Sequence, residues 1–151
     1  MALVLRRAFV AASLAWALLL VAAPFLASRA PASGLATATV VAVYAIGSLV
    51  CHQLPKRSYR LWTAQMPVCA RCTGIYAGAA IAAIAALAGT GPAIRRARLI
   101  LAVAVAPSLL TLVYEWTTGR TPANTIRFAA GLPIGVAVAW LIVAASEDQV
   151  N

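Results

Sequence analysis

Three cysteines and a single histidine are the residues of this sequence whose types and spacing best suit metal chemistry. Cys51 and His52 are adjacent, and Cys69 and Cys72 follow in a Cys-Ala-Arg-Cys turn. Such a turn directs two thiolates at one point, and three cysteines with one histidine are a common tetrahedral zinc set. Soft thiolates with an imidazole favour zinc, with copper(I) and iron as competitors. The sequence therefore predicts a zinc site with Cys51, His52, Cys69 and Cys72 as ligands.

Two other interpretations of the cysteines stay open. Cys69 and Cys72 are expected at the start of a helix, where the helix dipole and Arg71 both favour the thiolate. A thiol pair in that position could exchange electrons with a quinone or with a partner thiol. The simplest alternative is that the cysteines are small hydrophobic residues and that His52 only caps a helix.

A second polar group comprises Glu115, Asn124 and Arg127. Glu115 ends one apolar run and Arg127 begins the next, so a helical hairpin would bring the two near the same membrane interface. An ionisable residue beside a membrane span is a functional candidate by default, and Glu115 could act as a base next to a metal-bound water. The alternative is that Glu115 and Arg127 pair only to fix the hairpin, or that Arg127 reaches to the headgroups.

The elements that must position these residues are apolar helices. The chain is 64% hydrophobic and 10% charged, with a mean hydropathy of +0.92. This composition excludes a soluble domain and a disordered chain, and unbroken apolar runs exclude an outer-membrane barrel. We predict an all-α fold, a single-domain polytopic membrane helix bundle with about five transmembrane helices, four being the main alternative. The predicted spans are 8–27, 35–50, 73–89, 99–116 and 126–145, with the polar Cys/His insert between the second and third.

Small residues predict how two of these helices pack. Gly74 and Gly78 are four positions apart, as are Gly131 and Gly135. This spacing lets helix backbones approach closely in lipid, so we expect the third run to be central. An oligomer of identical chains is left open. The first run could be a signal peptide, but its length favours an uncleaved helix.

The net charge of +9 comes from basic residues at the ends of the apolar runs. The expected partner is therefore a bilayer with anionic headgroups, and no polar domain is present to bind nucleic acid. With five crossings the two termini lie on opposite sides of the membrane. The distribution of basic residues then favours a plasma-membrane protein with its N-terminus and its Cys/His insert in the cytoplasm.

Residues 51–58 (CHQLPKRS) and 67–76 (PVCARCTGIY) resemble a bacterial family of small predicted membrane proteins of unknown function. Asn124, Arg127 and the Gly131–Gly135 region are similar to a weaker C-terminal pattern of that family. The resemblance covers roughly residues 40 to 140 and leaves out the first helix. It implies a multi-helix membrane protein and no particular activity.

We therefore expect a membrane protein with a zinc-type site at its cytoplasmic face. The first alternative is a thiol–quinone oxidoreductase that uses Cys69 and Cys72. The second is a small transporter or accessory subunit without chemistry of its own.

Overall fold

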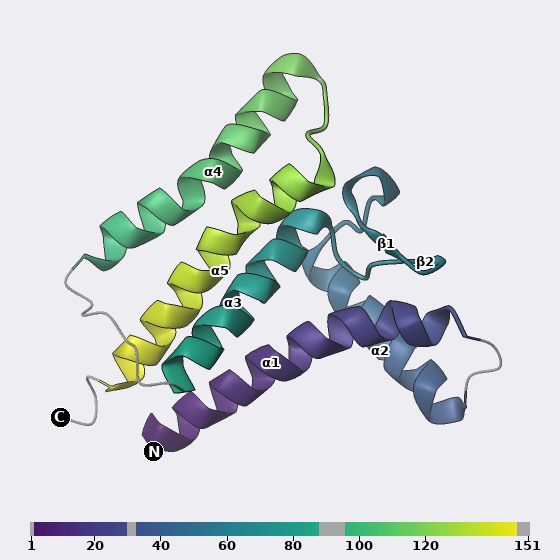
Figure 1. Ribbon diagram of the computed structural model, residues 1–151, viewed down its shortest axis with the longest axis horizontal. Coiled ribbons are helices and arrows are strands. Elements are labelled where there is room, and N and C mark those ends of the chain that lie inside the picture. The colour runs from purple at the N-terminus through teal and green to yellow at the C-terminus, as the bar shows by residue number, and fades with distance from the viewer. Residues whose placement is uncertain (1, 30–32, 88–95, 148–151) are drawn as a thin grey trace.

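Five helices and a small insert make up the computed structural model, which describes residues 2–29, 33–87 and 96–147 (Figure 1). The all-α fold expected from the apolar runs is confirmed, with the insert between the second and third helices. The insert carries a short hairpin that the sequence did not predict, in which Arg60 pairs with Gln65 and Leu61 with Ala64. The elements are α1 (Ala2–Ala27), α2 (Gly34–Val50), the 3-10 turn η1 (Pro55–Arg57), β1 (Arg60–Leu61), β2 (Ala64–Gln65), α3 (Ala70–Leu87), α4 (Ala97–Thr118) and α5 (Asn124–Glu147).

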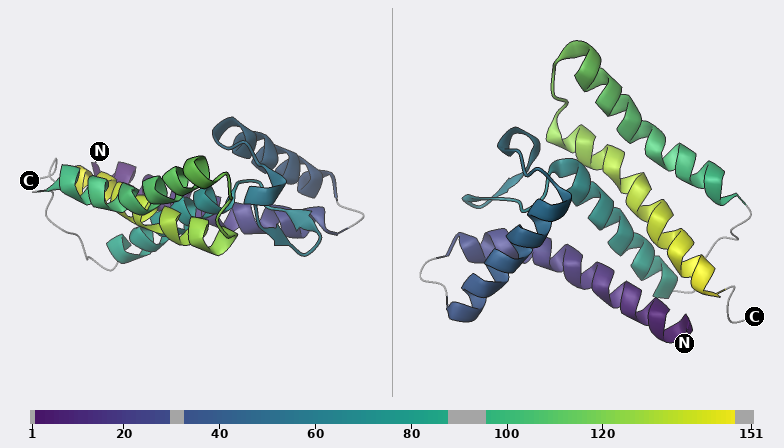
Figure 2. Two further views of the ribbon diagram at one scale, coloured as in Figure 1. Left: turned by 90° about the horizontal axis from the view of Figure 1, so that it is seen from above. Right: turned by 180° about the vertical axis from the view of Figure 1, so that it is seen from behind.

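Four of the helices, α1, α3, α4 and α5, are long and apolar enough to cross a bilayer. The exception is α2, an apolar helix of 17 residues. Figures 1 and 2 show α2 at a steep angle to α3, α4 and α5, across α1. Of the five predicted spans, the second is therefore the one that does not run with the bundle.

Contacts between the helices fix their directions. The α3 and α5 helices are parallel, because Gly74 faces Phe128 and Gly78 faces Leu132 one turn further along both. The first helix runs the opposite way, since Arg6 at its start donates a hydrogen bond of 2.6 Å to the Ala86 carbonyl at the end of α3. The beginning of α1 and the end of α5 therefore lie at the same end of the bundle (Figure 1). The expectation of termini on opposite sides is wrong, because it counted α2 as a crossing.

The helix bounds differ from the predicted runs mainly at the ends. The third helix begins at Ala70 rather than Thr73, which places Cys72 in its first turn. The first helix begins at Ala2 rather than residue 8 and so includes Arg6 and Arg7. The predicted end of the third span at Gly89 lies outside the described residues.

The predicted glycine packing is present between α3 and α5. A Cβ atom on Gly74 would lie 2.1 Å from the Phe128 carbonyl oxygen, and one on Gly135 would lie 1.8 Å from the Ile75 carbonyl oxygen. The other two glycines of the pattern are equally close to the facing backbone. No side chain fits at such distances, so glycine is what allows the two helices to touch. Because α3 also packs against α1, it is central, as expected.

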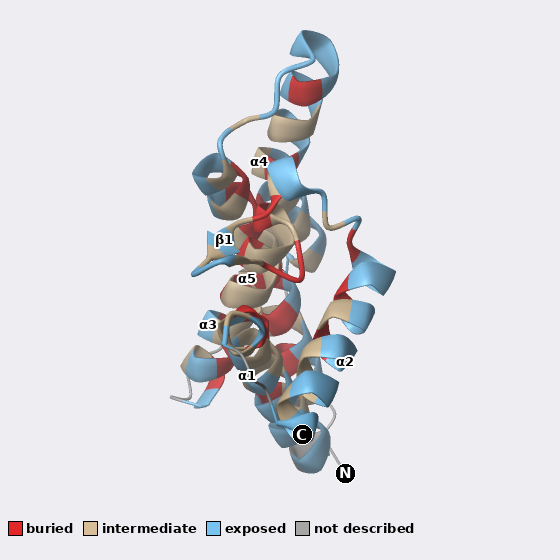
Figure 3. Ribbon diagram, turned by 90° about the vertical axis from the view of Figure 1, so that its right-hand side faces the viewer, coloured by how far each residue is buried: buried red, intermediate tan, exposed pale blue. Residues whose placement is uncertain are grey.

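The insert is anchored in a core formed with α1 and α2. Leu20 of α1, Val43 of α2 and Met66 and Val68 of the insert are buried together, and Cys51 belongs to the same cluster. In Figure 3 the buried segments gather where the insert meets the helices. The residues around the cysteines are therefore held by packing.

We predict that Gly135→Ala destabilises the bundle, because the added methyl group would overlap the Ile75 carbonyl oxygen. Overpacking of this kind costs on the order of 1–3 kcal/mol. The midpoint of thermal unfolding in mild detergent should fall clearly. The control is Gly34→Ala, where a Cβ would meet nothing within 4 Å. Equal midpoints for the two variants would show that the α3–α5 contact is not as close as described.

Candidate metal centre

The sulfur atoms of the three cysteines lie close together. The Sγ atoms of Cys51, Cys69 and Cys72 all lie within 4.8 Å of one another, and all three thiols are free. Cys51 follows the last residue of α2, Cys69 immediately precedes α3, and Cys72 lies in the first turn of α3. In the part of the chain that the structure describes, this is the only such cluster of histidine, cysteine and acidic side chains.

A glycine and a glutamine hold the end of α2 against the segment before α3. A Cβ on Gly47 would lie 2.3 Å from the Pro67 carbonyl oxygen, so a larger residue would push α2 away. Gln53 has a positive φ of 47° and donates from Nε2 to the carbonyls of Tyr44, at 2.9 Å, and Pro67, at 2.7 Å. The Gln53 amide therefore joins α2 directly to the chain leading into Cys69. Sequence reasoning missed this role, because nothing local marks Gln53 as a bridge.

The cysteines also interact with one another. The backbone N–H of Cys69 donates to Cys51 Sγ over 3.2 Å. A hydrogen bond from the Cys72 thiol lowers the pKa of Cys69 well below its ordinary value, against the opposing effect of burial. The backbone N–H groups of Cys72 and Arg71 and the Cys51 thiol lower it further. Of the three cysteines, Cys69 is therefore the one whose thiolate form is favoured by its surroundings.

His52 is exposed, and its ring is outside the three-sulfur group, although it lines the same cavity. The reason lies in the backbone at Cys51, which is extended with φ −148° and ψ 136°. Side chains of consecutive residues in extended backbone point to opposite sides. The structure thus brings three of the four predicted ligands together, and ligation by His52 stays a prediction.

Glu115 and Arg127 come together as a buried ion pair. They are 7% and 1% exposed, and Arg127 Nη2 lies 2.8 Å from Glu115 Oε1. Arg57 Nη2 approaches the other carboxylate oxygen of Glu115 at 3.4 Å. The hairpin predicts the pairing of Glu115 with Arg127 but not the contact with Arg57, because the position of Arg57 depends on the fold of the insert. The carboxylate is therefore held between two guanidinium groups.

Further contacts tie the insert and α4 to the bundle near the cysteines. Asn124, the first residue of α5, donates from Nδ2 to the Ser58 carbonyl at 3.2 Å. Arg71 donates from Nη2 to Thr111 Oγ1 of α4 at 2.7 Å. The Tyr59 ring of the insert meets the Phe128 ring of α5 edge-on. Asn124 was grouped with Glu115 and Arg127 from the sequence, and its role is to hold the insert.

A cavity of about 350 Å³ joins the two polar groups that the sequence presented separately. Its wall contains all three cysteines, His52, and three arginines from the insert, α3 and α5, while Glu115 does not line it. The arginines are Arg57, Arg71 and Arg127. The site is thus a thiol cluster beside a small cavity that is lined by three arginines, at one end of the bundle.

Comparison with known proteins gives a family but no activity. The chain is 30% identical over 127 residues to the uncharacterized protein MJ1492 of Methanocaldococcus jannaschii, covering 80% of this chain and 78% of the relative. It is 32% identical over 92 residues to an uncharacterized protein of Methanothermobacter thermautotrophicus, covering 61% of this chain and 83% of that protein. No solved structure matches.

The family expected from the two motifs is found, although the relatives named above are archaeal, so the restriction to bacteria is not supported. A family model described as a predicted membrane protein matches residues 51–141, from the first cysteine to the last part of α5. The match leaves out α1 and all of α2, and for the first helix this is what the resemblance implied. The chain belongs to the DUF2085 family of predicted membrane proteins.

Proposed function

We propose that Cys51, Cys69 and Cys72 bind one zinc ion, and that this site fastens the end of α2 to the start of α3. The observation that carries the proposal is the mutual approach of the three sulfurs to within 4.8 Å. In tetrahedral zinc sites with Zn–S bonds of about 2.3 Å, neighbouring sulfurs are about 3.8 Å apart. Only a small contraction of the cluster would be needed to reach that spacing.

The fourth zinc ligand decides whether such a site is structural or catalytic. A closed set of four protein ligands is typical of structural zinc, and an open position is typical of catalytic zinc. His52 borders the cavity and could supply the fourth ligand if its side chain turned inward. Without it, the open position would face the cavity. Glu115 as a base beside a metal-bound water stays a prediction, because its carboxylate already contacts two guanidinium groups.

Thiol redox chemistry is the second candidate, and the lowered pKa of Cys69 favours it. A thiolate beside two further thiols is suited to disulfide exchange. In such a reaction the Cys69 thiolate and the Cys72 thiol would form a disulfide. Their two electrons, with one proton from Cys72 and one from water, would reduce a quinone to the quinol. A metal-free protein with a reversible Cys69–Cys72 disulfide would support this candidate over zinc.

We also propose that the protein resides in the plasma membrane with the cysteine end of the bundle toward the cytoplasm. The proposed zinc site supports this, since zinc binds reduced cysteines and the cytosol keeps cysteines reduced. The larger number of basic residues at this end supports it as well, because cytoplasmic segments are enriched in lysine and arginine. Among the described residues they include Lys56, Arg57, Arg60, Arg71, Arg120 and Arg127, against Arg6, Arg7, Arg96 and Arg98 at the other end.

Purified protein should contain about one zinc ion per chain, measured by inductively coupled plasma mass spectrometry. Cys51→Ser, Cys69→Ser and Cys72→Ser should each lose most of that zinc, because each removes one of three convergent sulfurs. Ser48→Ala, an exposed change in α2, serves as the control and should keep its zinc. His52→Ala should weaken binding only if the imidazole is a ligand. Zinc content that is unaffected by all three cysteine variants would refute the site.

Glu115→Gln should destabilise the protein, because it leaves the buried Arg127 without its carboxylate partner. Breaking one side of a buried pair costs about 3–5 kcal/mol, whereas removing both sides costs much less. The thermal midpoint should therefore fall in Glu115→Gln and recover in part in Glu115→Gln/Arg127→Met. If the double variant is less stable than the single one, the pair does not work in this way.

Membrane orientation can be read from two added cysteines, Thr63→Cys in the hairpin turn and Val4→Cys near the start of α1. The two positions lie toward opposite ends of the bundle, and both residues are exposed. A membrane-impermeant maleimide added to intact cells should label Val4→Cys and not Thr63→Cys, with the wild-type chain reporting its native thiols. Labelling of Thr63→Cys alone would place the cysteine end outside.

A further inference from the structure

We propose that the cavity beside the cysteines binds a phosphate group, carried either by a free phosphate compound or by an anionic lipid headgroup. Three guanidinium groups from three different elements line this one small cavity. Guanidinium groups bind oxyanions with paired, charge-assisted hydrogen bonds, and a phosphate offers enough oxygens to meet several of them. The proposal goes beyond the zinc site and does not require it.

The first supporting observation is a set of unused donors. Arg127 is 1% exposed, and within the described residues its Nε and Nη1 atoms have no hydrogen-bond partner. Arg71 donates a hydrogen bond from Nη2 to Thr111, but its buried Nε is also without a partner. Buried polar groups of proteins almost always have partners, and those without one call for an unseen water, ion or ligand. Both arginines line the same cavity, so a rotation of either side chain would present an unpartnered donor to an anionic ligand bound there.

The second observation is the charge around the cavity. Arg57, Arg71 and Arg127 supply three positive charges, and Glu115 neutralises one of them. A zinc ion held by three cysteinates would neutralise a second, since that complex carries one net negative charge. At least one positive charge is therefore left over, whether or not metal is bound. An oxyanion in the cavity would balance it.

The third observation is that both arginines from the helices lie where a helix disfavours them. Arg71 is in the first turn of α3 and Arg127 in the first turn of α5, and neither turn contains an acidic residue. Cations near a helix N-terminus oppose the helix dipole, which favours anions there. Because α3 and α5 are parallel, both positive helix ends face this end of the bundle. A bound anion would offset both of these unfavourable interactions between an arginine and the positive end of its helix.

The size and place of the cavity fit a small headgroup or metabolite. Its volume of about 350 Å³ is at the low end for small-molecule sites. It lies at the end of the bundle where α2 and α4 end and where α3 and α5 begin. A ligand could therefore reach it from the aqueous phase or from the lipid headgroups.

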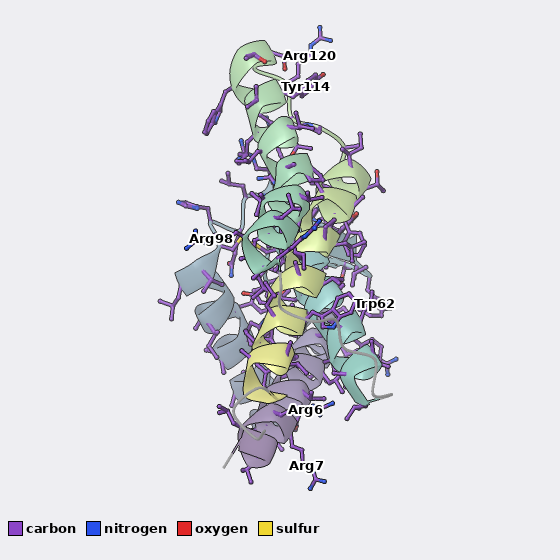
Figure 4. All side chains as sticks on the ribbon, turned by 90° about the vertical axis from the view of Figure 1, so that its left-hand side faces the viewer. Arg6, Arg7, Trp62, Arg98, Tyr114 and Arg120 are labelled. Atoms are coloured by element: carbon purple, nitrogen blue, oxygen red, sulfur yellow. The ribbon has the colours of Figure 1, made fainter. Side chains whose placement is uncertain are left out.

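Titration calorimetry in a neutral detergent tests the proposal, with inorganic phosphate and dihexanoyl phosphatidylglycerol as the two anionic probes. Dihexanoyl phosphatidylcholine, which has no net charge, is the control ligand for lipid binding that does not depend on a negative charge. The variants are Arg71→Gln and Arg57→Gln, compared at constant ionic strength. The matched control is Arg120→Gln, which removes the same charge from an exposed side chain outside the cavity wall (Figure 4). Each cavity variant should raise the Kd by about tenfold or more, and the control should leave it unchanged.

The outcomes separate the sources of the ligand. Binding of inorganic phosphate indicates that the oxyanion alone is recognised, and binding of phosphatidylglycerol alone indicates a lipid headgroup. Binding of neither, or an equal loss in Arg120→Gln and Arg71→Gln, would overturn the proposal. Zinc measured on the same samples keeps the two ideas apart. Phosphate binding without zinc refutes only the metal site, and zinc without binding of either probe refutes only the oxyanion site.

Discussion

The contact between α3 and α5 is the constraint on which the rest of the site depends. Glycines on both helices meet the facing carbonyl groups directly, so the two backbones touch and run parallel. This contact sets the two N-terminal ends at the same level. Arg71 and Cys72 from one helix and Arg127 from the other consequently line one cavity. A bulkier contact would separate the thiols of α3 from the buried arginine of α5.

The second requirement is that Cys51 returns to the start of α3 after a long insert. Two features supply it, the glycine that lets α2 touch the Pro67 carbonyl and the Gln53 amide that bridges two backbone carbonyls. The hairpin and its aromatic contacts with α1 and α5 then cover the loop. The thiol cluster is thus built by the end of α2, the folded insert and the start of α3, and its three cysteines lie within the segment that the family model matches.

Much of this arrangement could be predicted from the sequence. Run lengths gave the helices because crossing a bilayer requires about 20 apolar residues. Glycine spacing identified a close-packing surface on each of α3 and α5, although not that the two surfaces meet, and the clustering of cysteines identified the thiol site. In each case a local pattern is directly linked to one physical requirement.

What escaped prediction depends on tertiary geometry. Hydropathy indicates that α2 is apolar but not how it is tilted. Counting α2 as a crossing therefore led to the expectation that the two termini lie on opposite sides of the membrane. The Arg57–Glu115 contact depends on the folded insert, and the position of His52 depends on the extended backbone at Cys51. No sequence pattern reports these features, although His52 and Arg57 both lie within the motif that carried the family resemblance.

X-ray absorption at the zinc edge of the purified, zinc-loaded protein would count the sulfurs bound to one ion. We expect three sulfur neighbours at about 2.3 Å and one lighter neighbour, nitrogen or oxygen, at about 2.0–2.1 Å. A spectrum without sulfur neighbours, or with only the two that a Cys69–Cys72 turn could provide, would contradict the convergence of all three cysteines on one metal.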